Sequence, residues 1–135
     1  MPVKAKIRYD FKAETGTRKF FWKRSDLLEA AKKVRNQKVT LLRNLPLQGI
    51  NVETLNVDHE VYLIPGDGQK QTTAYAPVEM VVEADSLEDL MPLTLREEFR
   101  KIKILEPNQL LVSNNEVERF IFRVNEEYRS EIEEL

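Results

Sequence analysis

His59, the one histidine of the chain, is the side chain best suited to acid–base chemistry, because an imidazole exchanges its proton close to neutral pH. It stands between two carboxylates in Asp58-His59-Glu60, and three such groups together could bind a divalent cation. Neighbouring side chains of an extended strand point to opposite faces, however, so the three cannot converge. We interpret His59 as an exposed strand or loop residue. A small enzyme that depends on His59 or on a metal ion is our third and last hypothesis for the function.

Carboxylates gather at three further places: Glu83, Asp85, Glu88 and Asp89; Glu97 and Glu98; and residues 126–134. None of these has the spacing of a calcium-binding loop, which needs alternating Asp or Asn, a central glycine and a closing Glu. The first group lies where a strand gives way to a helix, and acidic side chains favour a helix N-terminus. We therefore predict no metal site and no cofactor.

Nucleophilic and phosphate-binding motifs are missing from the sequence. The chain has no cysteine, which removes disulfides and thiolate chemistry. Pro65-Gly66-Asp67-Gly68 lacks the spacing of a P-loop or a dinucleotide-binding loop and indicates a hairpin turn. No serine stands in a nucleophile-elbow context. We predict no catalytic residue, and an interaction protein rather than an enzyme.

Cations and aromatic rings alternate near the N-terminus, a mixture suited to single-stranded nucleic acid, where cations meet phosphates and rings stack on bases. Because the alternation puts Tyr9 and Phe11 on the side opposite the cations, we expect these two rings in the core. Phe21 or Trp22 is then the ring most exposed. The candidate nucleic-acid-binding residues are Lys4, Lys6, Arg8, Lys12, Arg18, Lys19, Trp22, Lys23, Arg24, Lys32 and Lys33.

Charge is divided unevenly along the 135 residues, although the net charge is only −2. Residues 1–45 carry 13 basic and 4 acidic side chains, whereas residues 46–135 carry 8 basic and 19 acidic ones. We expect a single domain, 1–135, with a basic lobe 1–45 and an acidic lobe 46–135. The two lobes attract each other within one fold, or between copies in an oligomer.

The first half of the chain has the pattern β-β-α-β. Strict alternation over residues 3–12 predicts a strand, and a turn at 13–17 leads to a second strand over 18–24. Ser25 caps a helix that we expect to end near Asn36, followed by a third strand over 39–45.

The second half predicts hairpins and short helices. Residues 50–57 and 60–64 are extended, and a returning strand covers 75–84, where Pro77 indicates a late start or an edge position. Short helices are expected at 87–91 and from 94 to about 100. A compact hairpin pairs 101–106 with 109–112.

A long C-terminal helix is the clearest element. Ser113 and Glu116 have the spacing of a capping box, and about twenty residues make a helix roughly 30 Å long. Phe122 lies about 140° from the apolar line of this helix, and we predict that it contacts a partner. The apolar line, expected to face the core, comprises Val117, Phe120, Ile121, Val124, Tyr128, Ile132 and Leu135.

These elements predict an α+β fold with a mostly antiparallel sheet, covered on one side by helices that include the long C-terminal one. No apolar run is long enough for a secretory signal or a membrane span, and cysteine is absent, so we expect a cytoplasmic protein with no membrane contact. The leading hypothesis is a non-catalytic module that binds a protein partner or forms a homodimer or other homo-oligomer. The alternative is a protein that binds single-stranded RNA or DNA through the basic N-terminal hairpin and first helix.

Overall fold

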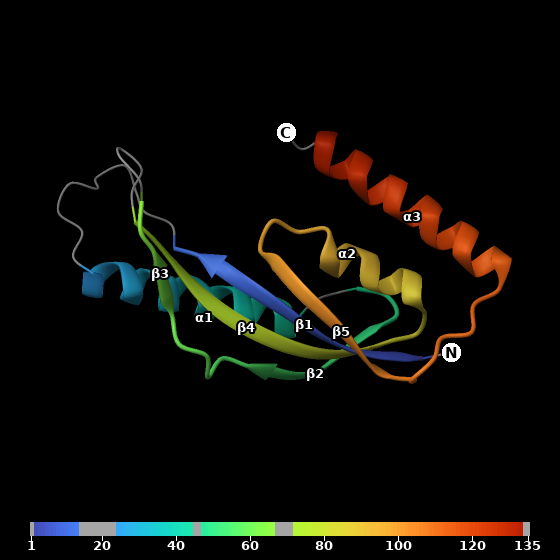
Figure 1. Cartoon of the computed structure of the whole chain (residues 1–135), viewed down its shortest axis with the longest axis horizontal. Helices are drawn as coiled ribbons and strands as arrows, with labels where there is room; N and C mark the ends of the chain where they lie inside the picture. Colours follow the sequence, from blue (N-terminus) through green and yellow to red (C-terminus); the bar gives the residue numbers. More distant parts are fainter. Residues whose placement is uncertain (1, 14–23, 45–46, 67–71, 134–135) are drawn as a thin grey trace.

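The structure, a computed structural model of the chain, describes residues 2–13, 24–44, 47–66 and 72–133. The predicted strand over 18–24 falls almost entirely outside these residues. The described elements confirm an α+β fold (Figure 1). In chain order they are β1 (Val3–Lys12), α1 (Arg24–Arg43), β2 (Ile50–Asn56), β3 (Tyr62–Ile64), β4 (Thr73–Ala84), the 3-10 helix η1 (Leu87–Leu90), α2 (Met91–Thr94), β5 (Phe99–Glu106) and α3 (Asn114–Glu133).

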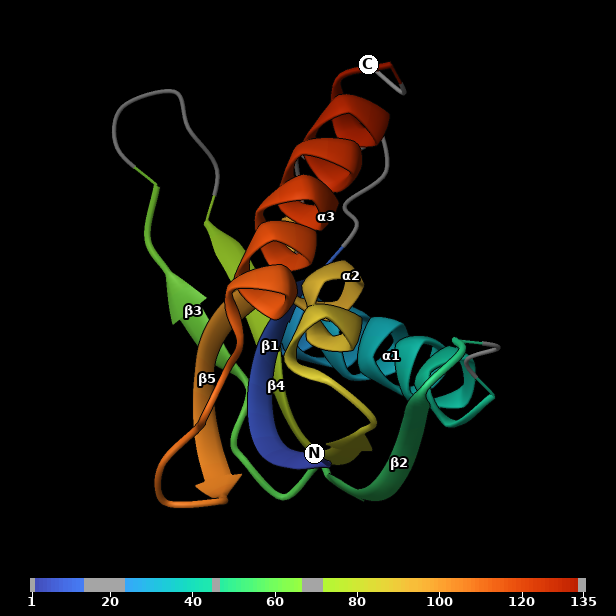
Figure 2. The same cartoon turned by 90° about the vertical axis from the view of Figure 1, so that its right-hand side faces the viewer.

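The strands form one antiparallel sheet in the order β2-β4-β1-β5, and β3 pairs with the same edge of β4 as β2 (Figure 2). Without β3, this order and the sequence of elements follow the split β-α-β (ferredoxin-like) topology, with η1 and α2 in the place of the second helix. Residues 1–45 therefore contribute a central strand, β1, which lies between β4 and β5 of residues 46–135.

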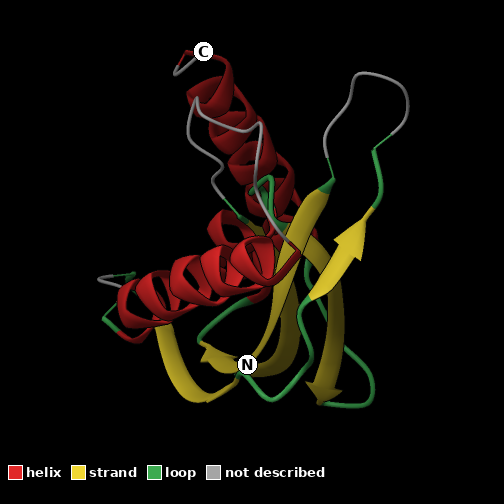
Figure 3. Cartoon of the chain, turned by 90° about the vertical axis from the view of Figure 1, so that its left-hand side faces the viewer, coloured by secondary structure: helices red, strands yellow, loops and turns green. Residues whose placement is uncertain are grey.

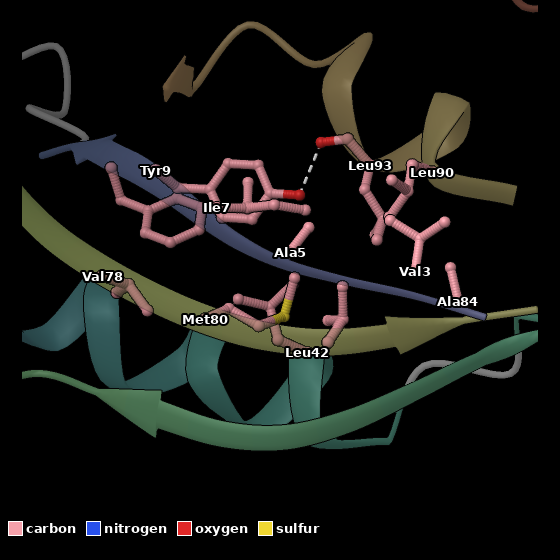
Figure 4. Packing of buried hydrophobic residues seen from close by; sticks show 12 residues of the cluster. Val3, Ala5, Ile7, Tyr9, Leu42, Val78, Met80, Ala84, Leu90 and Leu93 are labelled. Atoms are coloured by element: carbon pink, nitrogen blue, oxygen red, sulfur yellow. Dashed lines mark hydrogen bonds between the residues drawn. The ribbon is translucent and has the colours of Figure 1, made fainter. Parts of the chain in front are cut away.

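One face of the sheet is the core. The alternation predicted for β1 is confirmed, because Val3, Ala5, Ile7, Tyr9 and Phe11 are all buried and the intervening side chains point to the other face. β4 pairs with β1 so that buried residues stand opposite one another, as in Ile7 with Met80 and Tyr9 with Val78. Helix α1 covers this face with η1 and α2, whose Leu90 and Leu93 are buried in the same cluster (Figures 3 and 4). We call the opposite face the open sheet face.

Helix α1 continues to Arg43, so the predicted strand over 39–45 is wrong. The β-branched residues at 39 and 40 favour a strand, but the helical spacing that buries Leu27 and Ala31 continues to Leu42, which packs in the core. Thr40 also fits the helix, since its hydroxyl donates to the Asn36 carbonyl at 3.1 Å. Burial of Leu42 therefore outweighs local strand propensity.

Pro77 lies in the middle of the central strand β4, where the sequence predicted a late start or an edge. Its carbonyl accepts a hydrogen bond from Arg35 Nη1 at 3.4 Å, so this carbonyl points to the edge shared by β2 and β3. The nitrogen of a strand residue points to the same side as its carbonyl. β2 pairs with β4 up to Glu79 and β3 pairs only from Tyr75, so the missing N–H of Pro77 faces the gap between them.

Two further sequence predictions in the second half are wrong. The helix expected from 94 to about 100 is absent: α2 ends at Thr94, and Phe99 already pairs with Tyr9 in the sheet. Residues 109–112 are not a strand, because β5 forms its ladder with β1 and not with the segment after Pro107. The long-range pairing of β5 decides both regions, and it is not visible in local sequence.

Candidate interaction site

The predicted start of α3 is confirmed in atomic detail. The Glu116 backbone N–H donates to Ser113 Oγ at 3.1 Å, and the Ser113 hydroxyl lies 3.4 Å from Glu116 Oε1. This side-chain cap satisfies a backbone donor that the first turn of a helix leaves unpaired. The first turn of α3 is thereby stabilised by residues a few positions apart.

α3 rests on η1 and α2 and projects away from the sheet (Figures 1 and 2). Phe120 and Val124 are half-buried, and Arg119 forms an ion pair with Glu88 of η1 at 3.3 Å. Towards the C-terminal half, a cleft of about 400 Å³ opens between Glu127 and Ser130 on the helix and the segment 92–98. The helix is therefore supported along one flank only.

The apolar side of α3 is mostly uncovered, which corrects the prediction that it faces the core. Val117, Ile121, Tyr128 and Ile132 are 41%, 62%, 61% and 49% exposed. At about 100° per residue they fall within about 60° of one another around the helix. The neighbouring flank carries Phe120 and Val124, which are half-buried, and Val117 borders a small cavity that Leu87 of η1 also lines. Leu135 lies outside the described residues. We call these four side chains the α3 stripe.

Phe122 is 65% exposed, in agreement with its predicted position away from the core. It follows Ile121 by one residue and so points about 100° away from it around the helix. Phe122 is therefore not part of the α3 stripe, and its contact with a partner stays a prediction.

The open sheet face carries three of the predicted nucleic-acid-binding residues, Lys4, Lys6 and Arg8, in a row along β1. Each of them has a carboxylate nearby. Lys4 Nζ lies 3.1 Å from Glu53, Lys6 Nζ 3.8 Å from Glu79, and Arg8 Nε 2.9 Å from Asp10. The hydrogen bond to Glu53 raises the pKa of Lys4. Two of these pairs join the basic half of the sequence to the acidic half.

Several residues that sequence reasoning did not select lie on the same face. Tyr62 and Tyr75 stack with their ring centroids 5.4 Å apart, and the Arg100 guanidinium lies 5.8 Å from the Tyr75 centroid. Lys101 stands opposite Arg8, and Lys103 opposite Lys6. The alternation of lysine and isoleucine over 101–104 signals these two lysines, but only the pairing of β5 with β1 shows which face they join.

Asp10 is the common partner of several polar side chains on this face, although it is only 4% exposed. Its carboxylate accepts from the Tyr62 hydroxyl at 2.6 Å and from Arg8, and Arg100 Nε lies 3.9 Å away. The buried charge is thus surrounded by donors from β1, β3 and β5.

Lys12 also lies on this face, at the end of the row and opposite Tyr75, but the other predicted residues do not extend the row. Lys12 is exposed at the end of β1, whereas Lys32 and Lys33 are exposed on α1, which covers the opposite face of the sheet. The basic strand and the first helix therefore do not form one surface. Arg18, Lys19, Trp22 and Lys23 lie outside the described residues, and Arg24 is the first residue of α1.

His59 is half-buried and its Nε2 is hydrogen-bonded to Glu79 of β4. This hydrogen bond lowers the pKa of the Glu79 carboxyl, with smaller contributions from the charges of Lys6 and Arg8. The backbone carbonyl of His59 accepts from Arg35 at 2.9 Å. The imidazole is therefore hydrogen-bonded to the carboxylate that also lies near Lys6 on the open sheet face. Within the described residues, no three His, Asp or Glu side chains come together in a way that could hold a metal ion.

Comparison of the chain with protein-family models, with curated proteins and with solved structures found no match. None of the helices in the described part of the chain is both long and apolar enough to span a bilayer.

Proposed function

We propose that this protein is a non-catalytic cytoplasmic interaction module and that its contact surface is the α3 stripe. One observation carries the proposal: Val117, Ile121, Tyr128 and Ile132 form a line of apolar side chains that are 41–62% exposed. Single exposed apolar residues are ordinary, but several of them aligned on one helix face are typical of a protein contact.

The support of α3 also suits this role. The η1–α2 segment beneath it is anchored in the core by Leu90 and Leu93, which are 1% and 0% exposed. The helix is therefore held on a rigid base while its apolar face is available to a partner. Binding by apolar anchors spaced along one side of a helix is a recurrent mode of protein recognition.

Photo-crosslinking in the cells that make the protein tests this function. A photoreactive amino acid in place of Ile121 should form covalent adducts with the partner protein. The same group at Glu126 should form few, because Glu126 is exposed about 140° from Ile121 around the same helix. Adducts that are equally rare at both positions would contradict the proposal.

Binding of single-stranded nucleic acid is the second candidate function. The observation that favours it is the stacked pair Tyr62–Tyr75 beside Arg100, on a face that also carries Lys101 and Lys103. Among the described residues, these two lysines have no carboxylate within ion-pair distance, unlike Lys4 and Lys6. RNA-binding domains use aromatic rings and cations on a sheet, and the two tyrosines here are half-buried.

Reversing Lys101 and Lys103 to Glu tests the second function without breaking the ion pairs of β1. If the open sheet face binds a single strand, the log–log salt slope of about −0.7 per phosphate contact should become shallower in the double variant. Absence of binding by the wild type in dilute salt would remove this candidate.

A further inference from the structure

We propose that the α3 stripe binds the α3 stripe of a second copy, with the two helices antiparallel about a two-fold axis. This inference rests on the proposed function and identifies the partner of the α3 stripe as a second copy of the same chain. In a two-fold contact the same patch must be complementary to itself.

The spacing of the stripe meets this condition. When two antiparallel copies of α3 are aligned so that Ile121 faces Tyr128 of the second copy, Val117 faces Ile132. The axis then passes between residues 124 and 125, at the middle of the stripe. All four exposed apolar side chains thus find an apolar counterpart in a single register.

Charges beside the stripe favour the antiparallel direction. Glu118 and Arg129 are exposed on the flank that faces away from the body, about 20° apart around the helix. In the register above, Glu118 lies within about 3 Å along the axis of Arg129 of the second copy, and the reciprocal pair also forms. In a parallel two-fold pair this flank of one helix lies on the opposite side of the contact from the same flank of the second copy, so Glu118 and Arg129 would not meet. Neither side chain has an ion-pair partner among the described residues.

The charge along the whole helix points to the same direction. Residues 124–133 carry four glutamates and one arginine, whereas residues 114–123 carry two glutamates and two arginines, Arg119 and Arg123. An antiparallel pair brings the acidic half of each helix beside the half that carries these arginines, and a parallel pair brings the two acidic halves together.

The size of the contact sets its strength. The stripe spans about 22 Å from Val117 to Ile132, so one helix pair buries less surface than a permanent dimer requires. We therefore expect a reversible homodimer that forms at roughly micromolar or higher concentrations.

Sedimentation equilibrium of the purified full chain tests the partner. The wild type should approach about twice 15.8 kDa as concentration rises. Glu118→Arg and Arg129→Glu should each weaken association about tenfold, because each places two like-charged pairs in the interface, and the double reversal should restore it. Glu126→Arg, the same charge change about 150° from the middle of the stripe, is the matched control and should have a smaller effect.

Single cysteines test the direction, and the chain offers none of its own to interfere. Asn125→Cys lies next to the two-fold axis and should be joined to its copy by a short bifunctional thiol reagent. Glu118→Cys should not, because antiparallel copies hold the two positions about 20 Å apart along the axis. Equal linkage at both positions would contradict the antiparallel arrangement.

The two proposals fail separately. A chain that stays monomeric at all concentrations, while Ile121 crosslinks to a different protein, overturns the homodimer and leaves the interaction module intact. Association that no α3 substitution weakens overturns the homodimer through α3. If Ile121 gives no specific adduct in cells but the purified chain dimerises as described, the homodimer is supported in solution. The proposal that the α3 stripe acts as a contact surface in cells is then contradicted.

Discussion

The Tyr9 hydroxyl donates a hydrogen bond of 2.5 Å to the Leu93 carbonyl, and both residues are fully buried (Figure 4). This bond connects the central strand β1 to α2, the element on which α3 rests. Burial raises the pKa of Tyr9, so the hydroxyl keeps its proton and remains a donor. The position of α3 therefore depends on a polar contact inside the core.

Tyr9→Phe should lower the free energy of unfolding by about 1–3 kcal/mol, because the Leu93 carbonyl would remain buried without a donor. Urea unfolding of the dilute protein measures this. Tyr128→Phe removes a hydroxyl from a side chain that is 61% exposed and should leave the urea midpoint nearly unchanged. Equal shifts in both variants would show that the Tyr9–Leu93 bond has no special weight.

Arg35→Met should also destabilise the fold by about 1–3 kcal/mol. Arg35 donates to the carbonyls of His59 and Pro77, and so fills the gap in the sheet edge between β2 and β3. Methionine retains much of the apolar stem but leaves both carbonyls without this donor. Thermal unfolding should show the loss, whereas Lys32→Met, at an exposed position of the same helix, should change little. An Arg35→Met variant as stable as the wild type would contradict the role given to this side chain.

Replacing adjacent residues of α3 by alanine should change the free energy of unfolding by different amounts. Phe120→Ala should cost about 1–3 kcal/mol, below the range for a fully buried phenylalanine, because Phe120 is half-buried against the body. Ile121→Ala should stay within about 0.5 kcal/mol in dilute protein, since Ile121 is 62% exposed. Denaturant titration checks both, and a larger loss at Ile121 would mean that the stripe is packed in the core.

The His59–Glu79 pair should make stability depend on pH in the acid range. The pKa of Glu79 is lowered in the fold, so its contribution is present above the ordinary value of 4.5 and is lost as the pH falls through the folded-state value. Between about pH 7 and about pH 3, the urea midpoint of the wild type should therefore fall more than that of Glu79→Gln. Glu83→Gln, at an exposed position of the same strand, should follow the wild type. Parallel curves for all three proteins would contradict the assignment.

Local sequence patterns predicted those elements whose structure is decided locally. The alternation of β1 and the capping box at Ser113 are both confirmed, because each depends on residues a few positions apart. The length of α1 was not predicted, since it depends on burial of Leu42 against strands far along the chain. The exposed side of α3 was not predicted either, because an apolar periodicity does not show which flank meets η1 and α2.

On the open sheet face, too, local sequence patterns predicted the residues but not their contacts. The row of cations on β1 followed from alternation, but its pairing with Glu53 and Glu79 depends on the register of β2 and β4. The cluster around Asp10 joins Tyr62 and Arg100 from two other strands, and no motif in the sequence connects them. Long-range pairing therefore decides which predicted residues meet.

Amide hydrogen exchange of the full chain at low and high concentration tests the central claim, that the α3 stripe is a contact surface for a second copy. Our account predicts that exchange slows with concentration in residues 117–132, that the strands change little, and that Ile121→Asp abolishes the effect. Exchange in α3 that is the same at every concentration, or slowing that persists in Ile121→Asp, would contradict it.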